Sequence, residues 1–250
     1  DDNLVISAEF FKEYPSFFTE ENGKLYTTEY SLNPQTIQPQ SAMTIIDNQT
    51  GQIKAMIGGR NTSGRMLYNR ATVPQQPGSS IKPIAVYSAA LQKSFDLSSS
   101  GFGFANLGFD KQGEKGWGKF ITTASIVDDE PTHIEGRQWP NNSDFAFHGI
   151  RTFRQALQES LNVCAVKILA QVGVDYSYDL TEQFGISSLT DSDRNLAALG
   201  LGGMLEGAST LEMASAYSTF VNGGIHNEYS CYTKVTTRNG ELILEPTIEQ

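Results

Sequence analysis

The sequence predicts an α+β fold in which a largely antiparallel sheet accompanies a set of helices. Near each end of residues 41–245, two strand-like apolar runs flank a Gly-containing turn, which is the usual sign of a β-hairpin. Between these hairpins lie three segments whose apolar residues recur at near-helical spacing. Helical and strand-like segments thus occupy separate blocks of the chain, as in α+β proteins.

The bulk composition predicts a globular protein without nucleic-acid partners. The 250 residues are 39% hydrophobic, enough for one large domain or two small ones with a substantial core. A formal charge of −10 excludes nucleic acid, because phosphate binding needs clustered positive charge. Cys164 and Cys231 lie far apart and outside any Cys/His cluster, so we expect two free thiols, no metal site and no cofactor.

The N-terminal region differs in character from the rest. The chain opens with DDNLVISAEF, without an initiator Met or a signal-peptide pattern, so we expect a segment of a longer protein. No apolar run approaches the roughly 18 residues that a bilayer-spanning helix needs. Residues 1–40 lack a sustained period and end in NPQTIQPQ, which is typical of a linker or pedestal segment. The main domain is expected over residues 41–250.

The first elements of this domain are a hairpin and a helix. The runs AMTIID and QIKAMIGG flank the turn NQTG, which predicts the hairpin. After a Pro77-Gly78 turn, apolar residues recur at near-helical spacing from residue 79 to residue 93. Because they lie on most sides of the helix, we expect it to be buried.

A long irregular region precedes the next helices. Residues 95–150 are rich in Gly, Asp and Asn and contain VDDEPTHIEGRQWPNNSD, which predicts a long loop excursion with short elements. Loops of this length usually serve a functional site. The stretch TFRQALQESLNVCAVKILAQVG then predicts a short helix, a break at residues 160–162, and an apolar helix closed by Gly173.

Two further elements complete the chain. In ASTLEMASAYSTFVNGG, Ser209 and Glu212 stand in capping-box register, which predicts a helix that ends at Gly223-Gly224. In CYTKVTTRNGELILE, two strand-like runs flank Asn239-Gly240, which predicts a second hairpin.

Ser79 and Lys82 are the first candidate catalytic pair. In QQPGSSIKPIAVYSAALQ, two serines follow a Pro-Gly turn and precede a lysine. Side chains at i and i+3 share a helix face, so Ser79 can touch Lys82, whereas Ser80 at i+2 points elsewhere. We therefore expect the Ser79 hydroxyl to lie within hydrogen-bond reach of the Lys82 amine.

The predicted position of Ser79 suits attack on a carbonyl group. In the first helical turn, free N–H groups and the positive end of the helix dipole favour a developing oxyanion. A desolvated Lys82 would have a lowered pKa and could take the hydroxyl proton. The alternative is that Ser79 only caps the helix and that Lys82 is a solvated side chain.

Ser160 and Asn162 form a second candidate pair, at the predicted break between two helices. There Ser160 could pass a proton to a leaving amine, and the Asn162 amide could hold a substrate carbonyl or orient the lysine. The alternative is that the two residues end one helix and cap the next.

A Ser-His-Asp triad is not supported by the sequence. The three histidines, His133, His148 and His226, lie in predicted loops, and no GxSxG signature accompanies them. We expect them to be surface or loop-anchoring residues.

The combined motifs resemble a known family. The stretches YNRATVPQQPGSSIKPIAVYSAAL, FHGIRTFRQALQESLNVCAVKIL and LGLGGMLEGASTLEMASAYSTFVNGG closely resemble the transpeptidase domain of class A penicillin-binding proteins. The resemblance runs from about Ser41 to Glu245. It implies a fold similar to the serine β-lactamases, with a helical subdomain beside the sheet, and S-x-x-K and Ser-x-Asn elements are part of the shared signature.

The resemblance also implies a function. It implies an extracytoplasmic, membrane-anchored serine D,D-transpeptidase that cross-links peptidoglycan stem peptides ending in D-Ala-D-Ala. Ser79 would be the acylated nucleophile, Lys82 its base, Ser160 the proton relay, and Asn162 a ligand of substrate and lysine. β-Lactams would acylate Ser79 as substrate mimics.

Two departures from the family pattern stand out. No K-T-G occurs in the sequence, because TKVTT at residues 233–237 lacks the glycine. The glycosyltransferase domain expected upstream is also not found in these residues. We therefore expect a transpeptidase domain that is incomplete at its C-terminus, a complementary C-terminal fragment carrying K-T-G as a partner, and a membrane anchor outside this sequence.

Two other functions remain open from the sequence. A serine β-lactamase-type hydrolase shares the Ser-Lys chemistry but needs a base that activates water, and turnover of nitrocefin would favour it. A catalytically silent interaction module would retain the fold and lose reactivity, and labelling by a fluorescent penicillin would exclude it.

Overall fold

The computed structural model describes residues 8–26, 39–60, 67–99, 120–134 and 136–245. The chain divides into two compact units, Asp1–Pro39 and Gln40–Gln250. The first unit contains α1 (Ala8–Glu13), a 3-10 turn η1 (Pro15–Phe17), β1 (Thr19–Glu21) and β2 (Lys24–Tyr26). The two strands pair antiparallel across Asn22 and Gly23, whose positive φ angles of 57° and 74° suit a two-residue hairpin turn.

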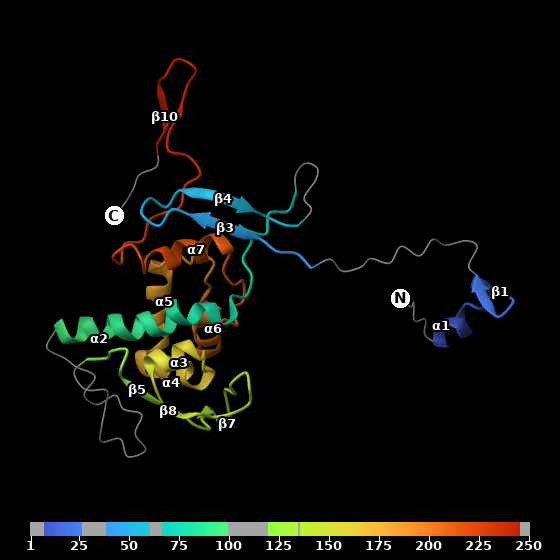
Figure 1. Cartoon of the computed structure of the whole chain (residues 1–250), viewed down its shortest axis with the longest axis horizontal. Helices are drawn as coiled ribbons and strands as arrows, with labels where there is room; N and C mark the ends of the chain where they lie inside the picture. The colour runs from blue at the N-terminus through green and yellow to red at the C-terminus, as the bar shows by residue number, and fades with distance from the viewer. Residues whose placement is uncertain (1–7, 27–38, 61–66, 100–119, 135, 246–250) are drawn as a thin grey trace. The chain divides into compact units, whose positions relative to one another are not determined.

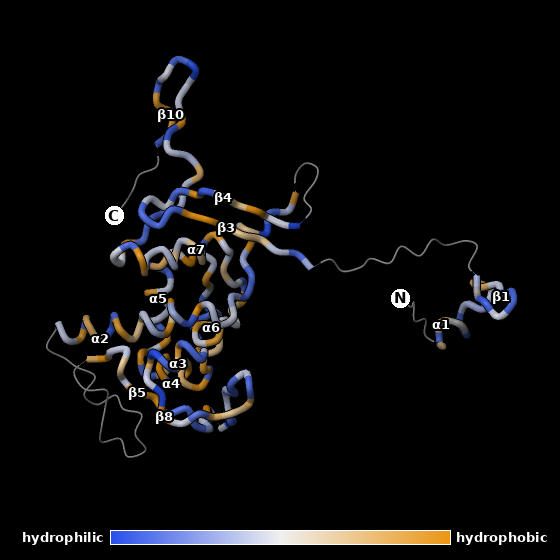
Figure 2. Tube along the Cα trace, viewed as in Figure 1, coloured by the Kyte–Doolittle hydropathy of each residue, from blue (hydrophilic) through white to orange (hydrophobic). Residues whose placement is uncertain are grey.

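In the second unit, the first predicted hairpin is confirmed. Strand β3 (Met43–Ile46) pairs antiparallel with β4 (Ile53–Ile57), with Met43 opposite Ile57. Helix α7 (Thr210–Ser218) packs against β3 (Figure 1), and the hydroxyls of Thr44 and Thr210 hydrogen-bond at 3.1 Å. On the other side chains of the hairpin, Met43, Ile45 and Ile57 are exposed, and Figure 2 shows the apolar stretch along β3.

The helix that carries Ser79 and Lys82 is buried, as predicted. It starts with a 3-10 turn η2 (Gly78–Ile81), continues as a π-helical segment η3 (Pro83–Ser88), and ends as α2 (Ala89–Ser99). It is therefore longer than predicted, since residues 95–99 are helical. Its fully buried apolar side chains are Ile81, Ile84, Ala85, Val86, Ala89 and Ala90.

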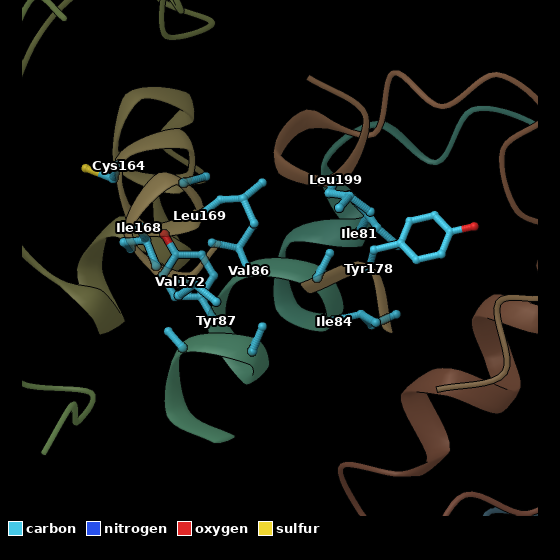
Figure 3. Close-up of a cluster of buried hydrophobic side chains, with 14 of the residues drawn as sticks. Ile81, Ile84, Val86, Tyr87, Cys164, Ile168, Leu169, Val172, Tyr178 and Leu199 are labelled. Atoms are coloured by element: carbon cyan, nitrogen blue, oxygen red, sulfur yellow. The ribbon is translucent and has the colours of Figure 1, made fainter. Parts of the chain in front are cut away.

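The core forms where other helices pack around this central helix. Helix α4 (Asn162–Val172) contributes Cys164, Ile168, Leu169 and Val172, which lie close to Val86 and Tyr87 in Figure 3. Helices α5 (Val174–Gln183) and α6 (Leu196–Leu201) also contact η3. Burying each large aliphatic side chain contributes about 1.5–3 kcal/mol, so this packing fixes the position of the Ser79 turn firmly.

The predicted loop excursion contains short elements in its described part. Strand β5 (Ile126–Asp129) pairs antiparallel with β8 (Gly149–Thr152), so that Asp129 lies opposite Gly149. Strands β6 (His133–Ile134) and β7 (Arg137–Gln138) also pair antiparallel. The part of the prediction that concerns residues 100–119 lies outside the described residues.

The remaining predicted elements are confirmed. Helix α3 (Phe153–Gln158) and α4 are separated by the predicted break, and Gly173 closes α4 with φ 95°. The capping box of α7 is present, because the Ser209 hydroxyl accepts from the Glu212 N–H at 3.1 Å and Glu212 Oε2 accepts from the Ser209 N–H at 2.8 Å. Helix α7 ends at Ser218, before the predicted glycines.

The second hairpin consists of β9 (Val235–Thr236) and β10 (Leu242–Leu244). All strand pairs in the described part of the chain are antiparallel. Helices α5 and α6 and the 3-10 turn η4 (Asp191–Asp193) were not predicted. Cys164 is buried, Cys231 is exposed, and both are free thiols as predicted.

Within the described residues, no helix is both long enough and apolar enough to cross a bilayer.

Candidate active site

Lys82 lies at the centre of a polar cluster beneath the start of the central helix. Its side chain is only 1% exposed. The amine Nζ donates to the Ser160 carbonyl at 2.7 Å, to Ser160 Oγ at 3.2 Å and to Asn162 Oδ1 at 2.6 Å. The structure therefore brings three of the four predicted site residues together across a long sequence separation.

The environment of Lys82 changes its acidity. Burial removes water from the ammonium group and lowers the pKa of Lys82 to about 8. Its hydrogen-bond partners are neutral oxygens, and no carboxylate forms an ion pair with it in the described part of the chain. A lysine with this pKa can act as a base in weakly alkaline solution, so the alternative of a solvated Lys82 is wrong.

Ser79 lies in the first turn of the same helix and is exposed. The predicted hydrogen bond between Ser79 and Lys82 is wrong: the described residues contain none. An ammonium group has three N–H donors, and the oxygens of Ser160 and Asn162 accept all three. The Ser80 hydroxyl instead donates to the Pro77 carbonyl at 2.8 Å, a local bond within the turn.

Ser160 occupies a strained position between α3 and α4. Its φ of 54° is left-handed, a conformation that usually favours glycine after a helix C-terminus. The Leu161 N–H donates to the Ala156 carbonyl at 3.0 Å, which closes α3 around this residue. The strained backbone lets both Ser160 O and Ser160 Oγ reach Lys82.

Asn162 is the first residue of α4, and its side chain does not cap the helix. Asn162 Nδ2 donates to the Asn141 carbonyl at 2.9 Å, which leaves Oδ1 to accept from Lys82. The Asn162 N–H donates to Asn142 Oδ1 at 2.8 Å. The simpler alternative, in which Asn162 serves only to cap α4, is therefore wrong.

Sequence reasoning missed Asn142 and the residues behind it. Asn142 is buried and contacts Asp129, which in turn contacts His148. Two signals pointed to such a group. The loop stretch holds several Asp and Asn residues, and the residue before α4 is Leu161, whose side chain cannot accept a hydrogen bond from the helix N-terminus.

The histidines act as loop anchors, as predicted. His148 Nδ1 lies 2.8 Å from Asp129 Oδ2, and His226 Nε2 lies 3.0 Å from the hydroxyl of the buried Ser215. His133 lies on β6. Ser215 is fully buried and therefore cannot serve as an exposed nucleophile.

A glycine after α6 supports the Ser79 turn from outside the helix. Gly202 has φ 76° and approaches Gly78 so closely that an added Cβ would overlap the Gly78 backbone. Gly203 has open space, since the nearest atom to an added Cβ is the Ala197 carbonyl at 3.7 Å. The close contact between Gly202 and Gly78 therefore fixes the backbone immediately before Ser79.

Comparison with known proteins adds a family match. The family described as "Penicillin binding protein transpeptidase domain" matches residues 118–247, just over half of the chain. The match includes Ser160 and Asn162, whereas Ser79 and Lys82 precede it.

Whole-protein relatives extend the match toward the N-terminus. The chain is 34% identical over 236 residues to penicillin-binding protein 1A of Clostridium botulinum (strain Hall, type A), covering 90% of this chain and 25% of that protein. It is 31% identical over 209 residues to penicillin-binding protein 1A of Neisseria meningitidis serogroup B, covering 81% and 22%. The chain spans about a quarter of the length of these relatives.

Solved structures show the same fold. The structure of penicillin-binding protein 1A from Haemophilus influenzae superposes with a TM-score of 0.62 at 27% identity, covering 84% of this chain and 27% of that chain. The PonA1 protein from Mycobacterium tuberculosis in complex with penicillin V gives a TM-score of 0.56 at 22% identity, covering 82% and 50%. These likenesses confirm the predicted α+β fold class.

Proposed function

The chain belongs to the family of penicillin-binding protein transpeptidase domains, and on this premise we propose that it carries the acyl-transfer site of a serine D,D-transpeptidase. Its substrates are peptidoglycan stem peptides that end in D-Ala-D-Ala, and β-lactams acylate the same serine. The observation that carries the proposal is the buried Lys82, held by Ser160 and Asn162 beside an exposed Ser79.

The acylation step follows from the chemistry of these groups. Neutral Lys82 takes the proton from the Ser79 hydroxyl while Ser79 Oγ forms a bond to the penultimate D-Ala carbonyl carbon. The C–N bond to the terminal D-Ala then breaks. The proton on Lys82 passes through Ser160 Oγ, which lies 3.2 Å from Nζ, to the leaving amine.

The second half of the reaction reverses this proton path. The amine of an acceptor stem peptide attacks the acyl carbon, loses its proton through Ser160 to Lys82, and releases Ser79 when the ester bond breaks. The amide N–H groups of the first helical turn stabilise the oxyanion in both halves.

A hydrolase of the β-lactamase type is the second candidate. Such an enzyme needs a base that directs water onto the acyl group. Among the described residues, no carboxylate hydrogen-bonds to Ser79, Lys82, Ser160 or Asn162. This arrangement favours a long-lived acyl-enzyme that waits for an amine.

Location and partners follow from the proposed substrate. Stem peptides are cross-linked outside the cytoplasm, so we place the domain there and its anchor in the membrane. No cofactor takes part in the proposed steps.

Intact mass spectrometry of the protein as its gene encodes it tests the proposal. Incubation with benzylpenicillin should give one stable adduct with the mass of the drug, and a D-Ala-D-Ala peptide offered with an amine acceptor should give the transpeptidation product. Rapid turnover of nitrocefin without a lasting adduct would favour the hydrolase. Absence of both would indicate a silent module.

Replacing Gly202 with alanine should weaken the site without touching a catalytic group. The new Cβ would overlap Gly78 and force a left-handed conformation on a non-Gly residue, which costs about 1–3 kcal/mol. We expect the free energy of unfolding, measured by urea titration, to fall by about this amount and penicillin acylation to slow by about 10- to 100-fold.

Gly203→Ala is the matched control, since it adds the same methyl group one residue away where there is room. It should leave both stability and acylation nearly unchanged. Equal behaviour of the two variants would show that the contact with Gly78 does not hold the Ser79 turn.

A further inference from the structure

Asn142 is a buried residue whose amide is bonded on every side. It is only 3% exposed. Its Oδ1 accepts from the Asn162 N–H at 2.8 Å and the Val163 N–H at 3.3 Å, while Nδ2 donates to the Ala146 carbonyl at 2.9 Å. These partners fix which way the amide faces, because only its oxygen can accept from N–H groups.

Through these bonds Asn142 caps α4 from a loop 20 residues earlier in the chain. The helix has no local side-chain cap. The neighbouring Asn141 carbonyl accepts from Asn162 Nδ2 at 2.9 Å. Both the backbone and the side chain of Asn162 are therefore tied to residues 141 and 142, which leaves Asn162 Oδ1 free to face Lys82.

Asp129 supports Asn142 from the opposite side. Its carboxylate is fully buried at the end of β5. Asn142 Nδ2 donates to Oδ1 at 2.9 Å and to Oδ2 at 2.8 Å, and the His148 N–H donates to Oδ2 at 2.9 Å. Because a buried carboxylate needs such donors, Asp129 holds the amide of Asn142 in one orientation.

His148 completes the group at the protein surface. Its ring lies between two carboxylates, with Nδ1 2.8 Å from Asp129 and Nε2 3.0 Å from the exposed Asp144. The hydrogen bond to Asp129, assisted by the charge of Asp144, raises the pKa of His148. A protonated ring balances the buried negative charge of Asp129.

From this geometry we propose that Asn142, Asp129 and His148 are positioning residues, which orient Asn162 and Ser160 and thereby hold Lys82 in its working place. None of the three touches Lys82, so their effect passes through the N-terminus of α4. The inference rests on the proposed function, since it assigns these residues to the acyl-transfer site.

The proposal makes a specific demand on Asn142. Without its amide, the first turn of α4 loses two hydrogen bonds, and Asn162 loses the constraint that aims Oδ1 at Lys82. A displacement of about 1 Å at a reacting group can cost about 100-fold in rate. Water that enters around a displaced Asn162 would also restore hydration to the Lys82 ammonium group.

The test compares Asn142→Ala with Ser209→Ala in the protein as its gene encodes it. Both substitutions remove a buried helix N-cap, each with an expected loss of about 0.5–2 kcal/mol in stability, but Ser209 caps α7 and touches none of the four site residues. Two quantities are measured: the rate of benzylpenicillin acylation, and the titration midpoint of the Lys82 side chain by NMR.

Asn142→Ala should acylate about 10- to 100-fold more slowly, and its Lys82 midpoint should rise from about 8 toward the ordinary value of 10.5. Ser209→Ala should change neither quantity. Wild-type acylation rate and an unchanged Lys82 midpoint in folded Asn142→Ala would overturn the proposal.

An exchange of side chains provides a second test if Asn142→Ala does not fold. Asn142→Asp alone places two carboxylates together and should slow acylation, whereas Asn142→Asp combined with Asp129→Asn restores one amide and one carboxylate and should recover most of the rate. Equal rates for the single and the exchanged variant would contradict the proposal. If the wild-type protein forms no adduct, the proposed function fails, while the Lys82 midpoint still tests the positioning role.

Discussion

Replacing Ser79 with alanine is expected to abolish the covalent penicillin adduct. The variant lacks the oxygen that must bond to the β-lactam carbonyl carbon, and the other hydroxyl of the cluster, Ser160 Oγ, is held by Lys82 in the relay position. Acylation should therefore fall below detection and not merely slow down. Intact mass spectrometry after incubation with benzylpenicillin measures this directly.

Ser80→Ala is the matched control for this experiment. Ser80 is also exposed and lies in the same turn, but its hydroxyl donates to the Pro77 carbonyl. This variant should form adducts at the wild-type rate. An adduct on Ser79→Ala, located by peptide mapping to any other residue, would mean that the nucleophile has been assigned incorrectly.

Replacing Lys82 with methionine is expected to slow acylation by about 10²- to 10⁴-fold, the usual contribution of a general base. Methionine keeps much of the buried volume but cannot accept the Ser79 proton. Because only the neutral amine is a base, the wild-type rate should rise about tenfold per pH unit below the pKa of about 8 and level off above it. In Lys82→Met this rise should disappear. Stopped-flow acylation between pH 6 and 10 measures both effects.

Lys93→Met controls for the loss of a partly buried lysine. Lys93 lies on the same helix, donates to the Val172 carbonyl, and has its pKa lowered by burial. This variant can lose stability, but its pH profile should match that of the wild-type protein. A Lys82→Met profile that retains the limb near pH 8 would show that another group supplies the base.

Local patterns in the sequence were enough to predict most elements of the main unit. The Gly-containing turn between β3 and β4 and the capping residues of α7 act over a few neighbouring positions, so they can be read without the fold. The same holds for the break at Ser160 and the buried character of the helix after Pro77. Short α6 escaped prediction because six residues are too few to show a helical period.

Sequence spacing also selected the four candidate residues of the site, but it gave the wrong hydrogen bond. Helix geometry considers only partners within one turn, and it therefore paired Ser79 with Lys82. In the structure, the three N–H donors of Lys82 go to residues 78 and 80 positions away, because burial removes water and the α3–α4 turn presents oxygens in its place. The lowered pKa of Lys82 is a consequence of that burial.

What the sequence by itself determined is the set of local elements and the residue types that can carry acyl transfer. Tertiary packing alone decided that Asn142 caps α4, that Asp129 and His148 support Asn142, and that Gly202 meets Gly78. The physical reason is that a turn or a helical period is a property of a few consecutive residues, whereas a buried polar group takes whichever partner the packed elements bring within about 3 Å.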